Sequence, residues 1–79
     1  MPMAYVLITT EKGAVKSVLE SLKKIDAVEE TYRVYGVYDI IATVKAETMD
    51  KLKEIVTQDL RGLDKVTSTL TMIVVEETK

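Results

Sequence analysis

The chain lacks the residue types on which several kinds of site depend. Its 79 residues include no cysteine, no histidine, no tryptophan and no phenylalanine, with one proline and three glycines. Without cysteine or histidine there is no thiol nucleophile, no ordinary general base near neutral pH and no soft-metal site. We therefore expect a protein that is not an enzyme, with no catalytic residue, no metal and no cofactor.

Neither positive nor negative charge predominates in the chain. Eleven Lys and Arg against thirteen Asp and Glu give a net charge of -2, so no positive field attracts a phosphate backbone, and we expect no direct contact with nucleic acid. No apolar run is long enough to cross a membrane. The absence of cysteine fits a reducing compartment, and we expect a cytoplasmic location.

Small size is the next constraint. A chain this short buries only about 60% of the surface that its unfolded form exposes. Small domains are commonly reinforced by disulfides, a metal or a partner subunit, and this sequence lacks the residues for the first two. Self-association is the remaining means of stabilisation.

Hydrophobic periodicity predicts six elements in the order βαββαβ. Strands are expected at 4–10, 28–35, 38–45 and 66–75, the first and third apolar on both faces and therefore interior. Thr48 is expected to cap the second helix, and Gly62 to end it in a left-handed conformation. The helices are indicated by two stripes of apolar residues: Val15, Val18, Leu19, Leu22 and Ile25, then Met49, Leu52, Ile55, Val56 and Leu60.

The two halves of the chain resemble each other. An offset of 38 residues aligns Val6 with Val44, Leu22 with Leu60 and Val28 with Val66. This repeat predicts a single α+β domain over 1–79, a ferredoxin-like βαββαβ sandwich. Right-handed crossovers give a four-stranded antiparallel sheet in the order 4-1-3-2, with two helices on one face.

One face of this sheet is predicted to lie open. We expect the helices to cover Ala4, Val6, Ile8, Ala42, Val44, Val66, Leu70, Met72 and Val74. The opposite parity is also apolar, and it comprises Tyr5, Leu7, Ile41, Thr43, Ile73 and Val75. Because monomers rarely expose a contiguous apolar patch of this size, we expect two copies to pack sheet on sheet.

The segment Gly36-Val37-Tyr38-Asp39 permits two interpretations. It can be a plain hairpin, in which Gly36 supplies a positive φ and Asp39 bonds the turn backbone. It can also be a small polar site, in which turn amides donate to a carboxylate and Asp39 holds an ammonium. Hydroxyls from the last strand could add to such a site, namely those of Thr67, Ser68, Thr69 and Thr71. A ligand that carries both charges is an amino acid.

Other polar and aromatic groups have simpler explanations. The acidic pairs Glu29-Glu30 and Glu76-Glu77 are interpreted as solvated charges of an edge strand and a tail. Tyr5 and Tyr38 are the only candidates for stacking on RNA, and no basic cluster accompanies them.

The stretch TYRVYGVYDIIATVKAETMDKLKEIV, followed by GLDKVTSTLTMIVVEE, resembles the effector-binding (RAM) domain of the Lrp/AsnC (feast/famine) transcription regulators. The Gly-x-Tyr-Asp element is that family's most recognisable mark, matched by Gly36 to Asp39, and the resemblance covers 4–77. It implies a ferredoxin-like domain that dimerises through its sheet, often forms octameric rings and binds amino acids at subunit interfaces near this hairpin. It also implies that the stretch Thr67 to Thr71 helps to line the pocket.

The chain begins almost at its first strand, whereas the regulators carry an N-terminal helix-turn-helix. We therefore expect a stand-alone domain that binds an amino acid, forms a homodimer or higher oligomer, and associates with a full-length Lrp/AsnC regulator. One alternative is a small dimeric αβ-barrel enzyme, a monooxygenase or isomerase, which would need an enclosed pocket between sheet and helices. Another is a purely structural spacer subunit with no ligand, indicated if the hairpin is occluded in the assembly.

Overall fold

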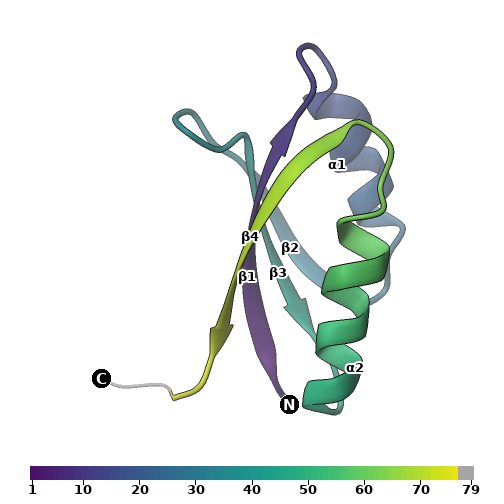
Figure 1. Cartoon of the computed structure of the whole chain (residues 1–79), viewed down its shortest axis with the longest axis vertical. Helices are drawn as coiled ribbons and strands as arrows, with labels where there is room; N and C mark the ends of the chain where they lie inside the picture. The colour runs from purple at the N-terminus through teal and green to yellow at the C-terminus, as the bar shows by residue number, and fades with distance from the viewer. Residues whose placement is uncertain (77–79) are drawn as a thin grey trace.

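The computed structural model describes residues 1–76, and residues 77–79, which include part of the predicted acidic tail, lie outside the described part. The predicted βαββαβ order is confirmed (Figure 1). The elements are β1 (Met3–Thr10), α1 (Val15–Lys23), β2 (Val28–Arg33), β3 (Ile40–Lys45), α2 (Met49–Glu54), which continues as a π-helix η1 (Ile55–Leu60), and β4 (Val66–Val74).

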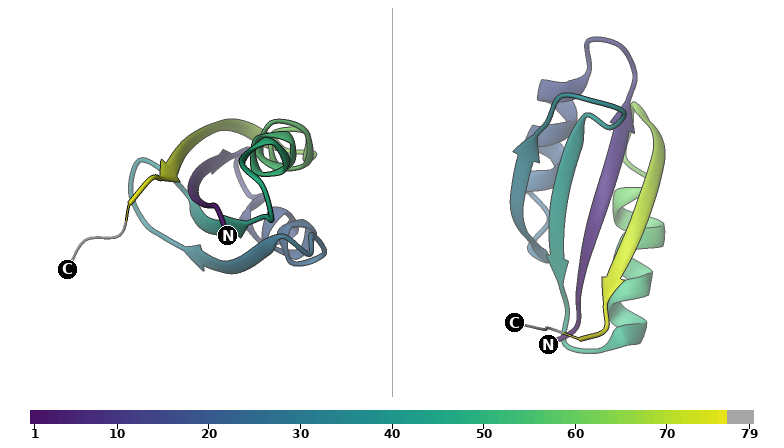
Figure 2. Two further views of the ribbon diagram at one scale, coloured as in Figure 1. Left: turned by 90° about the horizontal axis from the view of Figure 1, so that it is seen from below. Right: turned by 90° about the vertical axis from the view of Figure 1, so that its left-hand side faces the viewer.

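The four strands form one antiparallel sheet in the order β2-β3-β1-β4. This is the predicted order, with β1 and β3 inside and β2 and β4 at the edges. Figure 2 shows both helices behind the sheet when its other face is turned to the viewer, so one face is covered and one is open. The domain is thus a two-layer ferredoxin-like sandwich.

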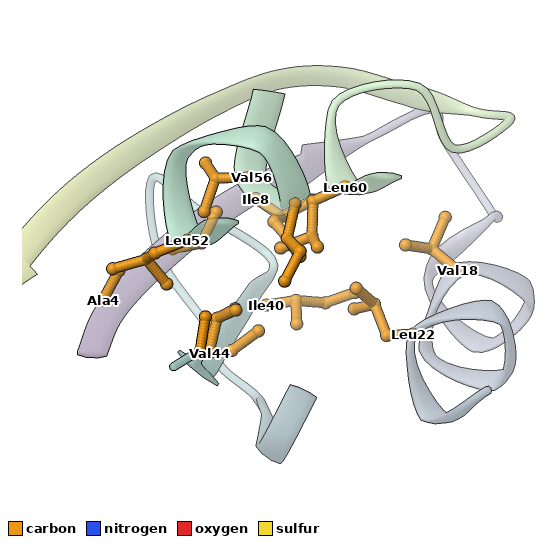
Figure 3. Packing of buried hydrophobic residues seen from close by; sticks show 13 residues of the cluster. Ala4, Ile8, Val18, Leu22, Ile40, Val44, Leu52, Val56 and Leu60 are labelled. Carbon is orange, nitrogen blue, oxygen red and sulfur yellow. The ribbon is translucent and has the colours of Figure 1, made fainter. Parts of the chain in front are cut away.

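The core lies between the sheet and the helices (Figure 3). Alternate residues of β1 and β3 point into it, as the pleat of a strand requires, and they meet the apolar stripes of the helices. The fully buried residues of the core are Ala4, Val6, Ile8, Leu22, Ile40, Ala42, Val44, Leu52 and Leu60. Side chains fill this interior, as a well-packed core demands.

A β-bulge in β4 overturns the predicted facing of that strand. Thr9 pairs with Ser68 but Thr10 pairs with Val66, so Thr67 is an extra residue. Val66 precedes the bulge and faces the helices as predicted. One extra residue moves the side chains that follow it to the opposite face, so the prediction is wrong for four residues beyond the bulge. Leu70, Met72 and Val74 lie on the open face, whereas Ile73 packs against the core.

Two further positions on the predicted open face also differ from expectation. Thr43 lies opposite Tyr5 on that face but is buried, and its Oγ1 accepts a hydrogen bond from the Glu30 N–H at 3.0 Å. Val75 lies beyond the end of β4 and is exposed. Neither residue therefore adds to a flat apolar surface.

The ends of the second helix combine one confirmed and one wrong prediction. Thr48 caps α2 as predicted, since its Oγ1 accepts from the Lys51 N–H at 3.1 Å. Gly62 does not adopt a positive φ; Lys65 does, at 71°. A Cβ at Gly62 would lie 2.5 Å from the carbonyl oxygen of Gln58, so close backbone approach explains the glycine.

Candidate functional site

The loop that joins β2 to β3 carries the Gly-x-Tyr-Asp element. The Val34 N–H donates to the Asp39 carbonyl at 2.9 Å and closes the loop. β3 begins at Ile40, so Tyr38 and Asp39, which were predicted to start the strand, belong to the loop. Figure 1 shows the loop projecting beyond the sheet, toward the side away from the helices.

Gly36 is needed for its backbone conformation. Its φ is +157°, which side chains of the L configuration rarely adopt, while a Cβ there would meet no atom within 4 Å. The strain of a substitution would therefore come from the backbone, and not from crowding. The predicted positive φ at this position is confirmed.

Asp39 ties the end of one interior strand to the start of the other. Its Oδ2 accepts from the Thr10 N–H at 2.9 Å and from Thr10 Oγ1 at 3.3 Å, and the Asp39 N–H donates to the Ile8 carbonyl at 2.9 Å. The carboxylate thus bonds backbone on β1, and its other oxygen, Oδ1, makes no hydrogen bond within residues 1–76. One oxygen orients the group and the other is left available.

The rest of the loop offers unused donors and exposed apolar side chains. The backbone N–H groups of Gly36, Val37 and Tyr38 donate to no other residue of the described chain. Tyr35 and Val37 are almost fully exposed, at 106% and 86%. Such apolar side chains at a projecting tip are unusual unless another surface covers them.

The predicted hydroxyl stretch lies at the same end of the sheet, on the other side of β1. Thr67 Oγ1 donates to the Thr9 carbonyl at 3.1 Å, next to the Thr10 that Asp39 bonds. A cavity of about 310 Å³ is lined by Thr67, Ser68 and Thr69, but no residue of the 34–39 loop lines it. Thr71 lies opposite Val6 and faces the helices. Within one copy, the two halves of the predicted site remain separate.

The open face of the sheet carries a second feature, which we call the open-face patch. Its residues come from all four strands, and their facing follows from their pairing opposite one another across the sheet. The patch consists of Tyr5, Leu7, Tyr32, Ile41, Leu70 and Met72. Tyr5, Tyr32, Leu70 and Met72 are 40–51% exposed.

Tyr32 of the open-face patch makes a hydrogen bond to a neighbouring acid on β2. Tyr32 Oη donates to Glu30 Oε2 at 2.9 Å. This hydrogen bond, with the negative charge of the carboxylate, raises the pKa of Tyr32 above its ordinary value of 10.0. Glu29, the other acid of the pair, lies 3.5 Å from the Lys45 Nζ, so each acid has a side-chain partner, Tyr32 on β2 or Lys45 on β3.

Residues 1–76 were searched for clusters of metal-binding side chains and for membrane-spanning helices. They contain no group of three or more acidic, cysteine or histidine side chains that could hold a metal ion. No helix in this part of the chain is long and apolar enough to cross a membrane.

Sequence reasoning missed three residues that contribute to these surfaces. Thr10, the partner of Asp39, is 29 residues away in the chain, and no local pattern links them. Leu70 and Met72 were assigned to the wrong face because the bulge at Thr67 leaves no signal in the hydrophobic pattern.

Comparison with known proteins identifies relatives of this chain. The family model described as the Lrp/AsnC ligand binding domain matches residues 3–79. The crystal structure of FFRP-DM1 shares 35% identity and a TM-score of 0.91 over 95% of this chain and 100% of its own. Escherichia coli AsnC shares 26% identity and a TM-score of 0.89 over 96% of this chain, but over only 52% of its own length.

A third structure shares the fold alone. A transcriptional regulator from Neisseria meningitidis, solved as a complex with L-Met, shares 18% identity and a TM-score of 0.85, over 99% of this chain and 52% of its own. A search of curated protein sequences finds no match.

Proposed function

Since the chain belongs to the Lrp/AsnC family of ligand-binding domains, we propose that it is a non-enzymatic module that binds an amino acid between copies of itself. The fold and the relatives support a regulatory, effector-binding domain. The proposal goes further in naming an amino acid as the ligand and a homo-oligomer as the assembly. The first depends on the loop and the second on the open-face patch.

The loop supplies the chemistry for a zwitterion. The unused N–H groups of Gly36, Val37 and Tyr38 can donate to a carboxylate. The free Oδ1 of Asp39 can accept from an ammonium, in a charge-assisted hydrogen bond that is stronger than a neutral one. Because Thr10 fixes the other oxygen, the carboxylate is oriented before the ligand arrives, which lowers the entropic cost of binding. The proposal depends on this observation: one oxygen of the Asp39 carboxylate is hydrogen-bonded to Thr10 and the other is available to a ligand.

A second copy would complete the site. The loop projects from the sheet with Tyr35 and Val37 exposed, and the cavity lined by Thr67 to Thr69 includes no residue of the loop. The open-face patch supplies the force for association, since each buried Å² of apolar surface contributes about 25 cal/mol. We propose a homodimer through this patch, joined into a larger oligomer by contacts that include the loop.

We propose that the open-face patch also binds a second partner, a full-length Lrp/AsnC regulator. AsnC is about twice as long as the part that this chain matches. A regulator of that kind contains a domain of the same fold, whose sheet could pair with this one.

Calorimetric titration with the standard amino acids tests the binding role. We expect the native protein to bind at least one of them, and Asp39→Asn to bind it at least ~10-fold more weakly, since a charge-assisted hydrogen bond contributes about 1.5–3 kcal/mol. Asparagine retains an oxygen that can accept from Thr10, so the fold should persist, as a thermal melt would show. Asp26→Asn, an exposed acid in the turn before β2, is the matched control and should bind normally. If the assembled native protein binds none of the amino acids, the sensing role is rejected.

The enzyme alternative has no comparable support. It requires an enclosed substrate cavity between the sheet and the helices. In residues 1–76 the packed side chains of the core occupy the space between the interior strands and the helices (Figure 3). The hollow that remains is a groove beside the edge strand β4.

A further inference from the structure

A groove runs between the edge strand β4 and the second helix. No residue of the loop lines it, and of the open-face patch only Leu70 does. Its volume is about 340 Å³, which lies within the range of small-molecule sites. Leu52 and Val56 from the helix and Ile73 from the strand form an apolar floor. In Figure 2, the helix lies directly behind β4 along most of the strand.

The groove exists because β4 presents small polar residues where the core calls for large apolar ones. The bulge at Thr67 turns Thr69 and Thr71 toward the helices, opposite Ile8 and Val6. Within residues 1–76, no buried side-chain oxygen lacks a partner. The hydroxyls of Thr69 and Thr71, which make no hydrogen bond there, are therefore not fully buried, and both residues line the groove.

Positive charge is concentrated at the rim. Lys53 and Arg61 both line the groove, and no carboxylate does. The ion pairs found in the described chain join Lys45 to Glu29 and Lys51 to Glu54, so neither of the two rim cations is neutralised. An anionic group at this rim would gain two charge-assisted contacts without competition from an acidic side chain.

The helix is irregular at this position. Residues Ile55–Leu60 form a π-helix, and the Arg61 N–H donates to the Val56 carbonyl, five residues earlier, at 3.3 Å. π-helical turns are rare and occur frequently at functional sites. Because such a turn contains more residues than an α-helical one, it changes the direction of the side chains that follow, including that of Arg61.

We propose that this groove binds a small aliphatic carboxylate, with its chain on Leu52, Val56 and Ile73 and its charged end between Lys53 and Arg61. The ligand differs in kind from the zwitterion assigned to the loop. Since no acidic side chain lines the groove, the ammonium of an amino acid would find no partner there. The groove also lies within one copy, so its ligand needs no assembly.

Titration of the ¹⁵N-labelled protein with hexanoate, followed by amide chemical shifts, tests the proposal. We expect saturable shifts at Val56 and Thr71, with the amides of residues 34–39 unmoved. Hexylamine, which has a similar chain and the opposite charge, should produce no saturable shift at these amides. Equal responses to hexanoate and hexylamine, or hexanoate shifts outside the groove only, would overturn the proposal.

Two sets of variants separate binding from folding. The double variant Lys53→Gln with Arg61→Gln should weaken hexanoate binding at least ~10-fold, whereas Lys16→Gln with Lys23→Gln, which removes two cations from α1, should leave it unchanged. Thr71→Leu should fill the groove and abolish binding while the melting temperature stays equal or rises. A folded Thr71→Leu protein that binds hexanoate as the native protein does would rule the site out.

Discussion

Replacing Met72 with alanine should weaken the proposed dimer, because this side chain lies in the open-face patch opposite Tyr5. Met72 is 51% exposed in a single copy. Full burial of a methionine side chain is worth about 1.5–3 kcal/mol, and about half of that remains to be gained on association, which is ~1 kcal/mol per copy. A symmetric dimer contains the change twice, so we expect a loss of ~2 kcal/mol, or a ~30-fold higher dissociation constant.

Sedimentation equilibrium over a range of concentrations measures this constant. Met49→Ala is the matched control, because Met49 is 37% exposed on α2 and lies outside the patch. Its dimer should dissociate as the native one does. The reasoning is refuted if both variants weaken the dimer equally, if Met72→Ala has no effect, or if the native protein is a stable monomer at micromolar concentration.

Three further predictions concern single residues. Thr48→Ala should lower the free energy of unfolding by ~1 kcal/mol through loss of the N-cap, while Thr57→Ala, within the helix, should not, as denaturant titration would show. Lys65→Gly should raise the melting temperature by several degrees, because glycine relieves the strain of a φ of 71°. The pKa of Tyr32 is raised above 10.0 by Glu30, so its contribution to stability is complete below pH 10 and is lost as the pH rises through the higher folded-state pKa. Ultraviolet titration should show the pKa of this tyrosine fall in Glu30→Gln, and an unchanged titration would contradict the assignment.

The fold was predictable from the sequence because the spacing of apolar residues distinguishes the helices from the strands. The doubly apolar strands 4–10 and 38–45 indicated the interior of the sheet, and the internal repeat indicated the topology. The facing of β4 was not predictable beyond Thr67. That strand is apolar or hydroxyl-bearing on both parities, so nothing in its composition indicates the extra residue of the bulge.

The candidate site was predictable only in part, for a related reason. Gly36 and Asp39 stand out locally, and the structure gives both a defined geometry. Contacts made across the sheet have no local signature, and these include the hydrogen bond that Asp39 accepts from Thr10. The π-helix at Ile55–Leu60 likewise follows an ordinary amphipathic pattern, so the groove beside it could not be foreseen.

The central claim is that the loop of one copy holds an amino acid only together with a second copy. Ligand binding and association must then strengthen each other, because linkage is reciprocal. Sedimentation equilibrium of the native protein, with and without a saturating concentration of the amino acid found by calorimetry, measures this coupling directly. The account predicts a shift toward the larger assembly when the ligand is present, and that Asp39→Asn shows a smaller shift. An unchanged mass distribution at full ligand saturation would place the site within a single copy and contradict the account.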